Sequence, residues 1–280
     1  MKPRLASRRR LAPSQLALHA ALVAVLVLSV LPFVLTMNLS LKSIEQFQHE
    51  RWKVAGPFQW GNFAEAWRVV RVYIANSVFV STVTAVGVVL LSACAGFAFS
   101  QARFRGKDVL FFAVLGGMMI PGVLYLVPKF VLVRDLGLMN SRWALLLPYW
   151  AEGQVFGIFL FRSYHDALPG GLLEAADVDG AGVFAKLRHI ALPLAAPIAG
   201  TLAVINVMFT WNDIIWPWIV LSDDSLKTIS VGMGVFQRAN AQNWGPMFAG
   251  FLLASIPLLV LFGLTGRLFV RGFTSGAFKA

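Results

Sequence analysis

A small number of amide and charged side chains interrupt the long apolar runs of this 280-residue chain. Aromatic rings beside amide and carboxylate groups suit a sugar, because rings stack on its C–H faces and polar groups bond its hydroxyls. A carboxylate within an apolar run costs about 2.5–3.5 kcal/mol on insertion scales, so it should face a cavity or a partner rather than lipid. The candidates for a solute path or substrate contact are Glu152, Gly153, Asn206, Trp211, Asn212 and Asp213.

Each candidate also has a purely structural interpretation. Glu152 could hydrogen-bond a neighbouring helix, and Asn206 could pair between helices, as polar side chains inside membranes usually do. The tryptophans from Trp211 to Trp218 are typical of the aromatic belt at the outer membrane interface. We hypothesise that Glu152 lies on or near a translocation path, and the structural alternatives stay open at this point.

Several kinds of chemistry find no support in the sequence. The G-x-x-x-x-G-K-[ST] phosphate loop is absent, since Gly106-Lys107 is followed by Asp108 and Gln101 stands where the first glycine belongs. We therefore expect no ATP hydrolysis by this chain, no catalytic residues, no metal ligands and no cofactor of its own. Cys94 is the only cysteine, so no disulfide can form within the chain, and we expect it to be a small packing residue. The chain has four histidines, His19, His49, His165 and His189, and they form no metal-binding motif. Two of them, His165 and His189, flank the 163–195 loop and should be solvated or paired there.

The composition is that of a membrane protein. Hydrophobic residues make up 58% of the chain and charged residues only 13%, whereas soluble domains carry about 25% charged residues. The basic residues behind the net charge of +11 flank apolar segments instead of forming one stripe, which argues against nucleic acid. We predict an all-α integral membrane bundle of six transmembrane helices, at roughly 16–37, 74–100, 108–133, 142–163, 196–221 and 247–270.

The basic N-terminus predicts the orientation of these spans. Five basic residues precede the first apolar run, which is long enough to span and ends without a clear cleavage site, so we expect an uncleaved first helix. Six spans then place both termini in the cytoplasm, with tails at 1–15 and 271–280 around a span domain at 16–270. The loop 165–195 is cytoplasmic in this topology. The basic cluster consists of Lys2, Arg4, Arg8, Arg9 and Arg10.

Two other segments predict irregular features. The third span carries Gly116-Gly117, Pro121-Gly122 and Pro128, so it should be broken, either as a static kink or where the bundle moves or lines a path. Outside the membrane, Asn62 with Glu65 three residues on forms a capping-box pattern. That pattern predicts an amphipathic surface helix, which could be a membrane anchor or a docking site for a binding protein; its apolar face would carry Phe63, Trp67, Val70 and Ile74.

The segment from Leu168 to Pro197 is short and polar, although it lies between two apolar spans. Its pattern predicts two small helices, Leu172–Val178 and Ala181–Ile190, around a turn at Asp179-Gly180 where glycine can take positive φ. The second helix would place Phe184, Leu187 and Ile190 on one face. The segment should form a rigid knob at the cytoplasmic surface, unless it is a helical hairpin that merely caps the bundle.

The same segment resembles the EAA loop of ABC importer permeases. The resemblance is carried by Glu174-Ala175-Ala176, Asp179-Gly180-Ala181, Ile190 and Leu192-Pro193, and it is closest to the carbohydrate-importer family that includes the second permease subunit of maltose-type systems. Gly170-Gly171 departs from the polar or charged residues usual there. Other segments similar to that family are Ser40–Lys42, Trp211–Asp213, Trp216-Pro217, Val220–Asp223, Phe269–Gly272, Gly276 and Lys279.

The resemblance implies a sugar or oligosaccharide permease of a bacterial-type plasma (inner) membrane, powered by ATP that separate subunits bind. Besides the lipid bilayer, it implies three kinds of protein partner: a homologous second permease subunit, a pair of ATP-binding subunits and an extracytoplasmic sugar-binding protein. The implied contacts with the ATP-binding subunit are Glu174, Ala175, Ala176, Asp179, Gly180 and Ala181.

Two rival functions predict different features. An ion-coupled secondary transporter would need two repeat halves and intramembrane carboxylates, for which only Glu152 and Asp213 qualify. A non-transporting membrane scaffold would need no polar path at all.

Overall fold

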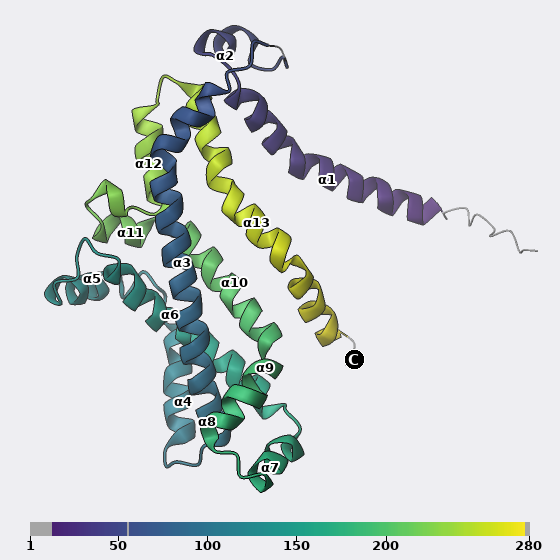
Figure 1. Cartoon of the computed structure of the whole chain (residues 1–280), viewed down its shortest axis with the longest axis vertical. Coiled ribbons are helices and arrows are strands. Elements are labelled where there is room, and N and C mark those ends of the chain that lie inside the picture. Colours follow the sequence, from purple (N-terminus) through teal and green to yellow (C-terminus); the bar gives the residue numbers. More distant parts are fainter. Residues whose placement is uncertain (1–12, 55, 278–280) are drawn as a thin grey trace, which may run out of the picture. The chain divides into compact units, whose positions relative to one another are not determined.

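The computed structural model describes residues 13–54 and 56–277, and every regular element within them is a helix. The four longest helices are α1 (Pro13–Ser40), α3 (Gly61–Gln101), α6 (Trp143–Asp166) and α13 (Trp244–Ala277) (Figure 1). The shorter helices are α2 (Ile44–Glu50), α4 (Lys107–Gly116), η1 (Gly117–Met119), α5 (Leu126–Asp135), α7 (Gly170–Val178), α8 (Val183–Lys186), η2 (Leu187–Ala191), α9 (Leu192–Leu194), α10 (Ala196–Asn212), α11 (Ile215–Val220), η3 (Asp224–Leu226) and α12 (Ile229–Ala239). The predicted tails are 1–15 and 271–280, and residues 1–12 and 278–280 of them lie outside the described residues.

Within the described residues, four helices are long and apolar enough to cross a membrane. They correspond to the first, second, fourth and sixth predicted spans. A fifth span results only if Val183–Leu194 and Ala196–Asn212, which meet at 75°, count as one. The all-helical prediction is therefore confirmed, whereas six spans are not.

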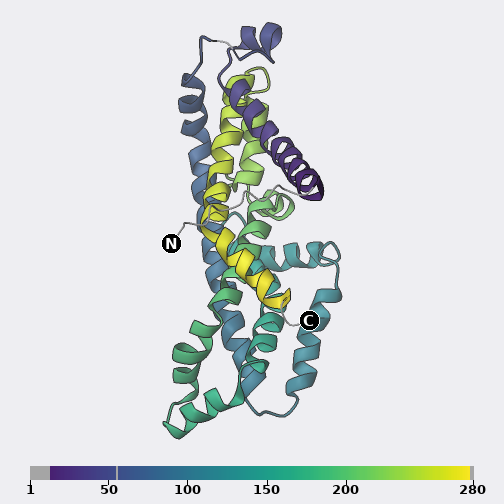
Figure 2. The ribbon, with the colours of Figure 1, turned by 90° about the vertical axis from the view of Figure 1, so that its right-hand side faces the viewer.

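The third predicted span, 108–133, is not a single helix. The chain leaves the helical conformation after η1, and α5 begins only at Leu126, so two ten-residue helices replace one span. Figure 2 shows α5 turned across the direction of α4. The interruption falls at the predicted glycine and proline positions, because Pro121 cannot donate the backbone hydrogen bond that a continuing helix needs.

The fifth predicted span, 196–221, also divides. Its helix α10 ends at Asn212, and Asp213 has the extended conformation φ −70°, ψ 119°. The short helix α11 follows. The backbone N–H of Trp216 donates to Asp213 Oδ1 at 3.2 Å, so the Asp213 side chain satisfies one of the free N–H groups at the start of α11.

The chain forms two compact units, and the boundaries between them fall inside α3, at the end of α12 and inside α13. One unit comprises residues up to 67 together with 240–253. In this unit, α2 begins with a capping box that was not predicted: Ser43 is its N-cap and Gln46 lies in its first turn. The predicted cap Asn62 lies inside α3 instead, and its Nδ2 donates to the carbonyl oxygens of Ser40 at 2.8 Å and Lys42 at 3.1 Å. The capping-box prediction at Asn62 was wrong because the side chain satisfies loop carbonyls rather than a helix start.

The second unit contains 68–239 and 254–280, and α3 is its longest packing surface. The predicted surface helix and second span are one continuous helix. Its buried stripe runs through Val70, Tyr73, Ser77 and Val80. Trp67, which was predicted on the apolar face of the surface helix, is exposed. The α3 backbone and side chains hold its neighbours: Trp150 Nε1 of α6 donates to Val83 O at 3.1 Å, and Thr210 Oγ1 of α10 donates to Ser81 Oγ at 2.8 Å.

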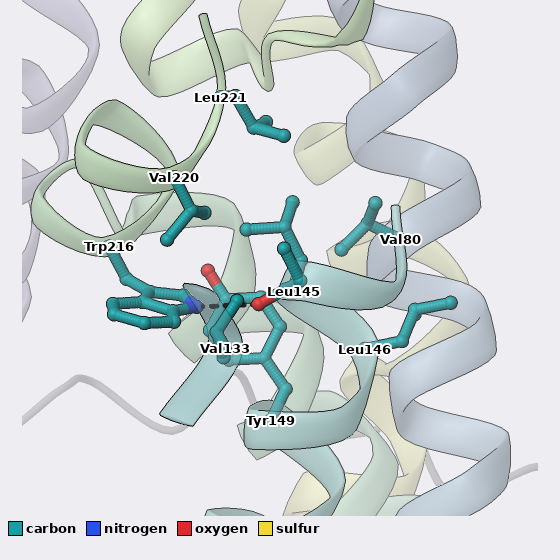
Figure 3. Close-up of a cluster of buried hydrophobic side chains, with 9 residues drawn as sticks. Val80, Val133, Leu145, Leu146, Tyr149, Trp216, Val220 and Leu221 are labelled. Atoms are coloured by element: carbon teal, nitrogen blue, oxygen red, sulfur yellow. Dashed lines mark hydrogen bonds between the residues drawn. The ribbon is translucent and has the colours of Figure 1, made fainter. Parts of the chain in front are cut away.

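One apolar core of this unit joins α3, α5, α6 and α11. Trp216 of α11 is 2% exposed, and its Nε1 donates to the Ala144 carbonyl oxygen at 2.9 Å, so the indole is fixed in position (Figure 3). Side chains of α6 surround it. The core consists of Val80, Val133, Ala144, Leu145, Leu146, Tyr149, Trp216, Val220 and Leu221 (Figure 3).

Candidate translocation cavity and coupling loop

The loop at 165–195, which was predicted to be cytoplasmic, is built on a tightly closed helix end. Helix α7 ends at Val178, and Gly180 takes the predicted positive φ of 74°. The Ala181 N–H donates to Ala176 O at 2.9 Å and the Gly180 N–H donates to Asp177 O at 3.0 Å. This pair of bonds is the Schellman arrangement, which satisfies the last carbonyls of a helix and fixes the path of the chain after it.

The second helix of the loop differs from its predicted bounds. It begins at Val183 after Gly182, passes through a π-helical turn at Leu187–Ala191 and ends at Leu194. Leu187 packs in a cluster with Phe97 and Ala191, but Phe184 is 71% exposed. Phe184 and Leu187 nevertheless line one common cavity, which agrees with their predicted position on one face; the π turn at Leu187–Ala191 was not predicted.

The predicted coupling residues lie together at the α7 end of this loop. Glu174, Ala175, Asp179 and Gly180 are exposed, Ala181 is half-buried, and Ala176 packs inward. Beside them three apolar side chains are strongly exposed: Val178, Val183 and Phe184. Lys186 Nζ forms an ion pair with Asp177 Oδ1 at 2.6 Å, which ties the second helix to the first. An exposed apolar tip on a closed loop is the kind of surface that binds a partner protein.

A cavity of about 810 Å³ lies behind the loop, between α3, the end of α6 and helices α7 and α8. His165 lines it and is 1% exposed, packed edge-on against Phe97 with 5.4 Å between ring centroids. Neither of its ring nitrogens has a hydrogen-bond partner among the described residues, so the prediction that it is solvated or paired was wrong. Cys94 also lines this cavity and is exposed rather than packed in a core.

A second cavity, of about 650 Å³, lies at the break in the third predicted span. It brings together three predicted site residues, Glu152 and Gly153 of α6 and Asn206 of α10, with Gly117 and Tyr125 from either side of the break. Its volume falls within the roughly 300–1,000 Å³ typical of small-molecule sites. Aromatic rings from three segments complete the wall: Tyr125, Phe156 and Phe209.

Gly153 has a packing role at this cavity. A Cβ atom there would lie 2.5 Å from Asn206 Oδ1 and 2.7 Å from Val88 Cγ2, so only glycine lets α6 approach α3 and α10 this closely. Asn206 is 5% exposed, and its Nδ2 donates to Leu202 O at 2.9 Å within its own helix. The amide nitrogen of Asn206 makes that hydrogen bond, so its carbonyl oxygen is the atom that faces Gly153.

Lys129 is a residue of this region that sequence reasoning missed. Its Nζ lies 2.7 Å from Glu152 Oε1, and the two side chains are 15% and 20% exposed. The ammonium group also lies 4.1 Å from the Trp216 ring centroid and 5.5 Å from that of Tyr125. A lysine within the predicted span 108–133 was the available signal, because ionisable side chains inside membranes are rare and usually paired.

The remaining candidates do not line this cavity. Asp213 accepts a hydrogen bond from Tyr149 Oη at 2.8 Å in addition to its bond at the start of α11. Trp211 is buried and lines a separate, largely apolar pocket between α3, α10 and α13. Asn212 is exposed, and its Nδ2 donates to Met208 O at 2.7 Å. The structure thus separates the 211–213 segment from the cavity that holds Glu152, Gly153 and Asn206.

Apolar helices of membrane-spanning length, a cavity lined by a paired carboxylate and aromatic rings, and a loop closed by backbone hydrogen bonds are together typical of the membrane component of a transporter. The chain belongs to the family described as binding-protein-dependent transport system inner membrane component, whose sequence profile matches residues 87–274. It is 35% identical to the "Probable ABC transporter permease protein YurM" of Bacillus subtilis (strain 168), over 88% of this chain and 82% of that protein.

Other relatives carry more specific names. The "Melibiose/raffinose/stachyose import permease protein MelC" of Bacillus subtilis (strain 168) is 29% identical over 89% of this chain and 91% of its own length. The "Diacetylchitobiose uptake system permease protein NgcG" of Streptomyces coelicolor is 26% identical over 93% and 88%. A chain of a bacterial ABC transporter that imports alginate has the same fold, with a TM-score of 0.79 at 20% identity over 92% of this chain and 98% of that one.

Proposed function

We propose that this chain is the permease subunit of an ATP-driven importer of a sugar or oligosaccharide. The relatives named for oligosaccharide uptake match it along nearly their whole length, which supports a carbohydrate as the solute. Its proposed partners are a homologous second permease subunit, a pair of ATP-binding subunits and an extracytoplasmic sugar-binding protein. Both termini would be cytoplasmic. Family membership favours this function over an ion-coupled transporter or a non-transporting scaffold.

The observation that carries the proposed coupling is the exposed tip of the closed α7–α8 loop. Val178, Val183 and Phe184 present apolar surface beside the exposed Glu174 and Asp179, on a loop whose turn is fixed by two backbone hydrogen bonds. Covering such apolar surface with a partner stabilises the complex by about 25 cal/mol for each Å² that is buried. We assign the ATP-binding subunit as that partner.

The mechanism follows from how such a contact can be used. When the ATP-binding pair closes, it moves the loop as a rigid body, and the attached helices turn the cavity toward the outside. Hydrolysis then lets the cavity reopen inward. ATP can drive this exchange only if the loop contacts differ between the two states, since coupling equals the difference in interaction free energy.

The test is ATP-driven sugar uptake into proteoliposomes that contain the whole complex with its binding protein. Phe184→Ala should reduce uptake at least tenfold while the complex still assembles. Phe112→Ala is the matched control, because Phe112 of α4 is 68% exposed against 71% for Phe184 but lies outside the loop. The control should retain uptake. Normal uptake by the Phe184 variant, or uptake by this chain without any ATP-binding subunit, would contradict the proposal.

A further inference from the structure

The ion pair between Lys129 and Glu152 is largely buried, with side chains that are 15% and 20% exposed. Removing two charges from water costs several kcal/mol per ion, and replacing a buried pair with apolar residues is often neutral or stabilising. Glu152 lines the 650 Å³ cavity, and Lys129 touches two residues of its wall, Glu152 and Tyr125. The position of the pair therefore points to a role toward whatever occupies the cavity.

The pair leaves one acceptor of Glu152 available. Lys129 Nζ binds Oε1 at 2.7 Å, and Oε2 accepts no hydrogen bond from residues 13–54 or 56–277. Lys129 is held from the other side by the ring of Trp216, which is itself fixed to the Ala144 carbonyl oxygen. This chain of contacts, Ala144 to Trp216 to Lys129 to Glu152, fixes the carboxylate at the cavity wall.

The charge of the pair selects a class of ligand. An ionised carboxylate accepts strong, charge-assisted hydrogen bonds from hydroxyl groups, and aromatic walls accept the C–H faces of a sugar ring. Glu152 lines the cavity, whereas Lys129 is not among the lining residues, so a ligand there meets the carboxylate rather than the ammonium group. A sugar bearing its own carboxylate would meet Glu152 as a like charge, which disfavours binding.

We infer that Glu152 is the hydroxyl-binding residue of this cavity and that Lys129 is its positioning residue, so that the cavity takes neutral sugars and rejects acidic ones. This inference rests on the proposed function and deepens it. It assigns a substrate class to the cavity and a role to Lys129.

Ligand binding to the purified complex in lipid nanodiscs tests the inference, without the binding protein so that its own preference does not enter. The probes are tritiated maltose, melibiose and diacetylchitobiose as neutral sugars and digalacturonate as the acidic one. The wild-type complex should bind at least one neutral probe and prefer it to digalacturonate. Glu152→Gln should lower the ratio of neutral to acidic affinity at least tenfold, because Lys129 is then uncompensated.

Two further variants separate recognition from structure. The first is the uncharged double variant Lys129→Met/Glu152→Gln, which should bind like the wild type if the pair only stabilises the fold. If Glu152 binds the sugar, as we infer, the double variant should bind the neutral probe at least tenfold more weakly. Lys129→Arg keeps the charge and should preserve the preference. Asp108→Asn is the matched control, because it removes a different ion pair, between Asp108 and Arg162 at 3.0 Å. Arg162 lies on α6, as Glu152 does, but it does not line this cavity.

Wild-type binding by the double variant, an unchanged ratio for Glu152→Gln, or no binding of any neutral probe in the millimolar range would overturn the inference. The proposed function fails by a different result, normal uptake by the Phe184 variant. The two failures are therefore distinguishable.

Discussion

The loop at 165–195 and the cavity of about 650 Å³ are held together in opposite ways. The loop closes through bonds between near neighbours in sequence, such as Ala181 to Ala176, and it leaves Phe184 and Val178 exposed. The cavity depends on side chains that come from distant segments of the chain. Lys129 binds Glu152, which is 23 residues away, and Gly153 of α6 packs against Asn206 of α10.

This difference suits the two roles proposed for them. A segment closed by its own backbone keeps its shape when its surroundings move, so it can transmit a displacement. A cavity closed by contacts between separate helices changes shape when those helices move, and alternating access requires such a change. We therefore expect single substitutions to lower the free energy of unfolding more at the cavity than at the loop.

The largest effect is expected at the support of the cavity. Trp216→Ala should lower the free energy of unfolding by about 3–5 kcal/mol, because it removes a buried indole and leaves a cavity. It also removes the donor to the Ala144 carbonyl oxygen and the ring beneath Lys129. Chemical unfolding in detergent measures the change.

Trp218 provides the control for this substitution. It lies on the same helix, α11, but is 66% exposed, so Trp218→Ala should change the free energy of unfolding by only about 0.5 kcal/mol or less. Equal effects of the two substitutions would show that α11 is not anchored through Trp216.

The next effect is expected where α6 crosses α3. A Cβ atom at Gly157 would collide with Ser92 Oγ and lie 3.0 Å from Leu202 Cδ2. Gly157→Ala should therefore destabilise by about 1–3 kcal/mol through overpacking. Gly116→Ala, at a helical position with no atom within 4 Å, should be neutral or stabilising. A neutral Gly157→Ala would mean that the helices separate at little cost.

The sequence predicted the loop better than the cavity, and the reason is the range of the interactions. The turn at Asp179-Gly180 and the first loop helix depend on residues a few positions apart, which a local pattern reports. The π turn after Phe184 escaped prediction, because apolar spacing assumes a uniform period of 3.6 residues.

The cavity could be predicted only in fragments. Glu152, Asn206 and the glycines and proline of the third span were each recognised as unusual, but nothing in the local pattern joined them. Lys129 was passed over because hydropathy averages a single charge into its apolar neighbours. The direction of α5 after the break depends on packing against Trp216 and other distant side chains, which spacing along the chain does not report.

A smaller effect is expected at the turn of the loop. Gly180 has φ +74°, a conformation that costs a residue with Cβ about 1–2 kcal/mol. Gly180→Ala should destabilise by that amount and reduce ATP-driven uptake, since the Schellman bonds loosen. Gly171→Ala, within α7 and with no atom near, is the control. If both variants transport equally, the turn geometry does not contribute to coupling.

The smallest effect is expected from the ion pair that bridges the two loop helices. Asp177 Oδ1 lies 2.6 Å from Lys186 Nζ, but the Asp177 side chain is 61% exposed, so water and salt screen the pair. Asp177→Asn should cost about 0.2–1 kcal/mol at low ionic strength and less at high salt, because exposed pairs contribute little. Unfolding measured at two salt concentrations gives both values, with Asp135→Asn as control for an exposed pair outside the loop. Since the backbone bonds of the turn remain in Asp177→Asn, uptake should stay within about twofold of the wild type, as expected for an exposed pair. A loss of uptake as large as that of Phe184→Ala would mean that this side chain, rather than the backbone, keeps the loop rigid.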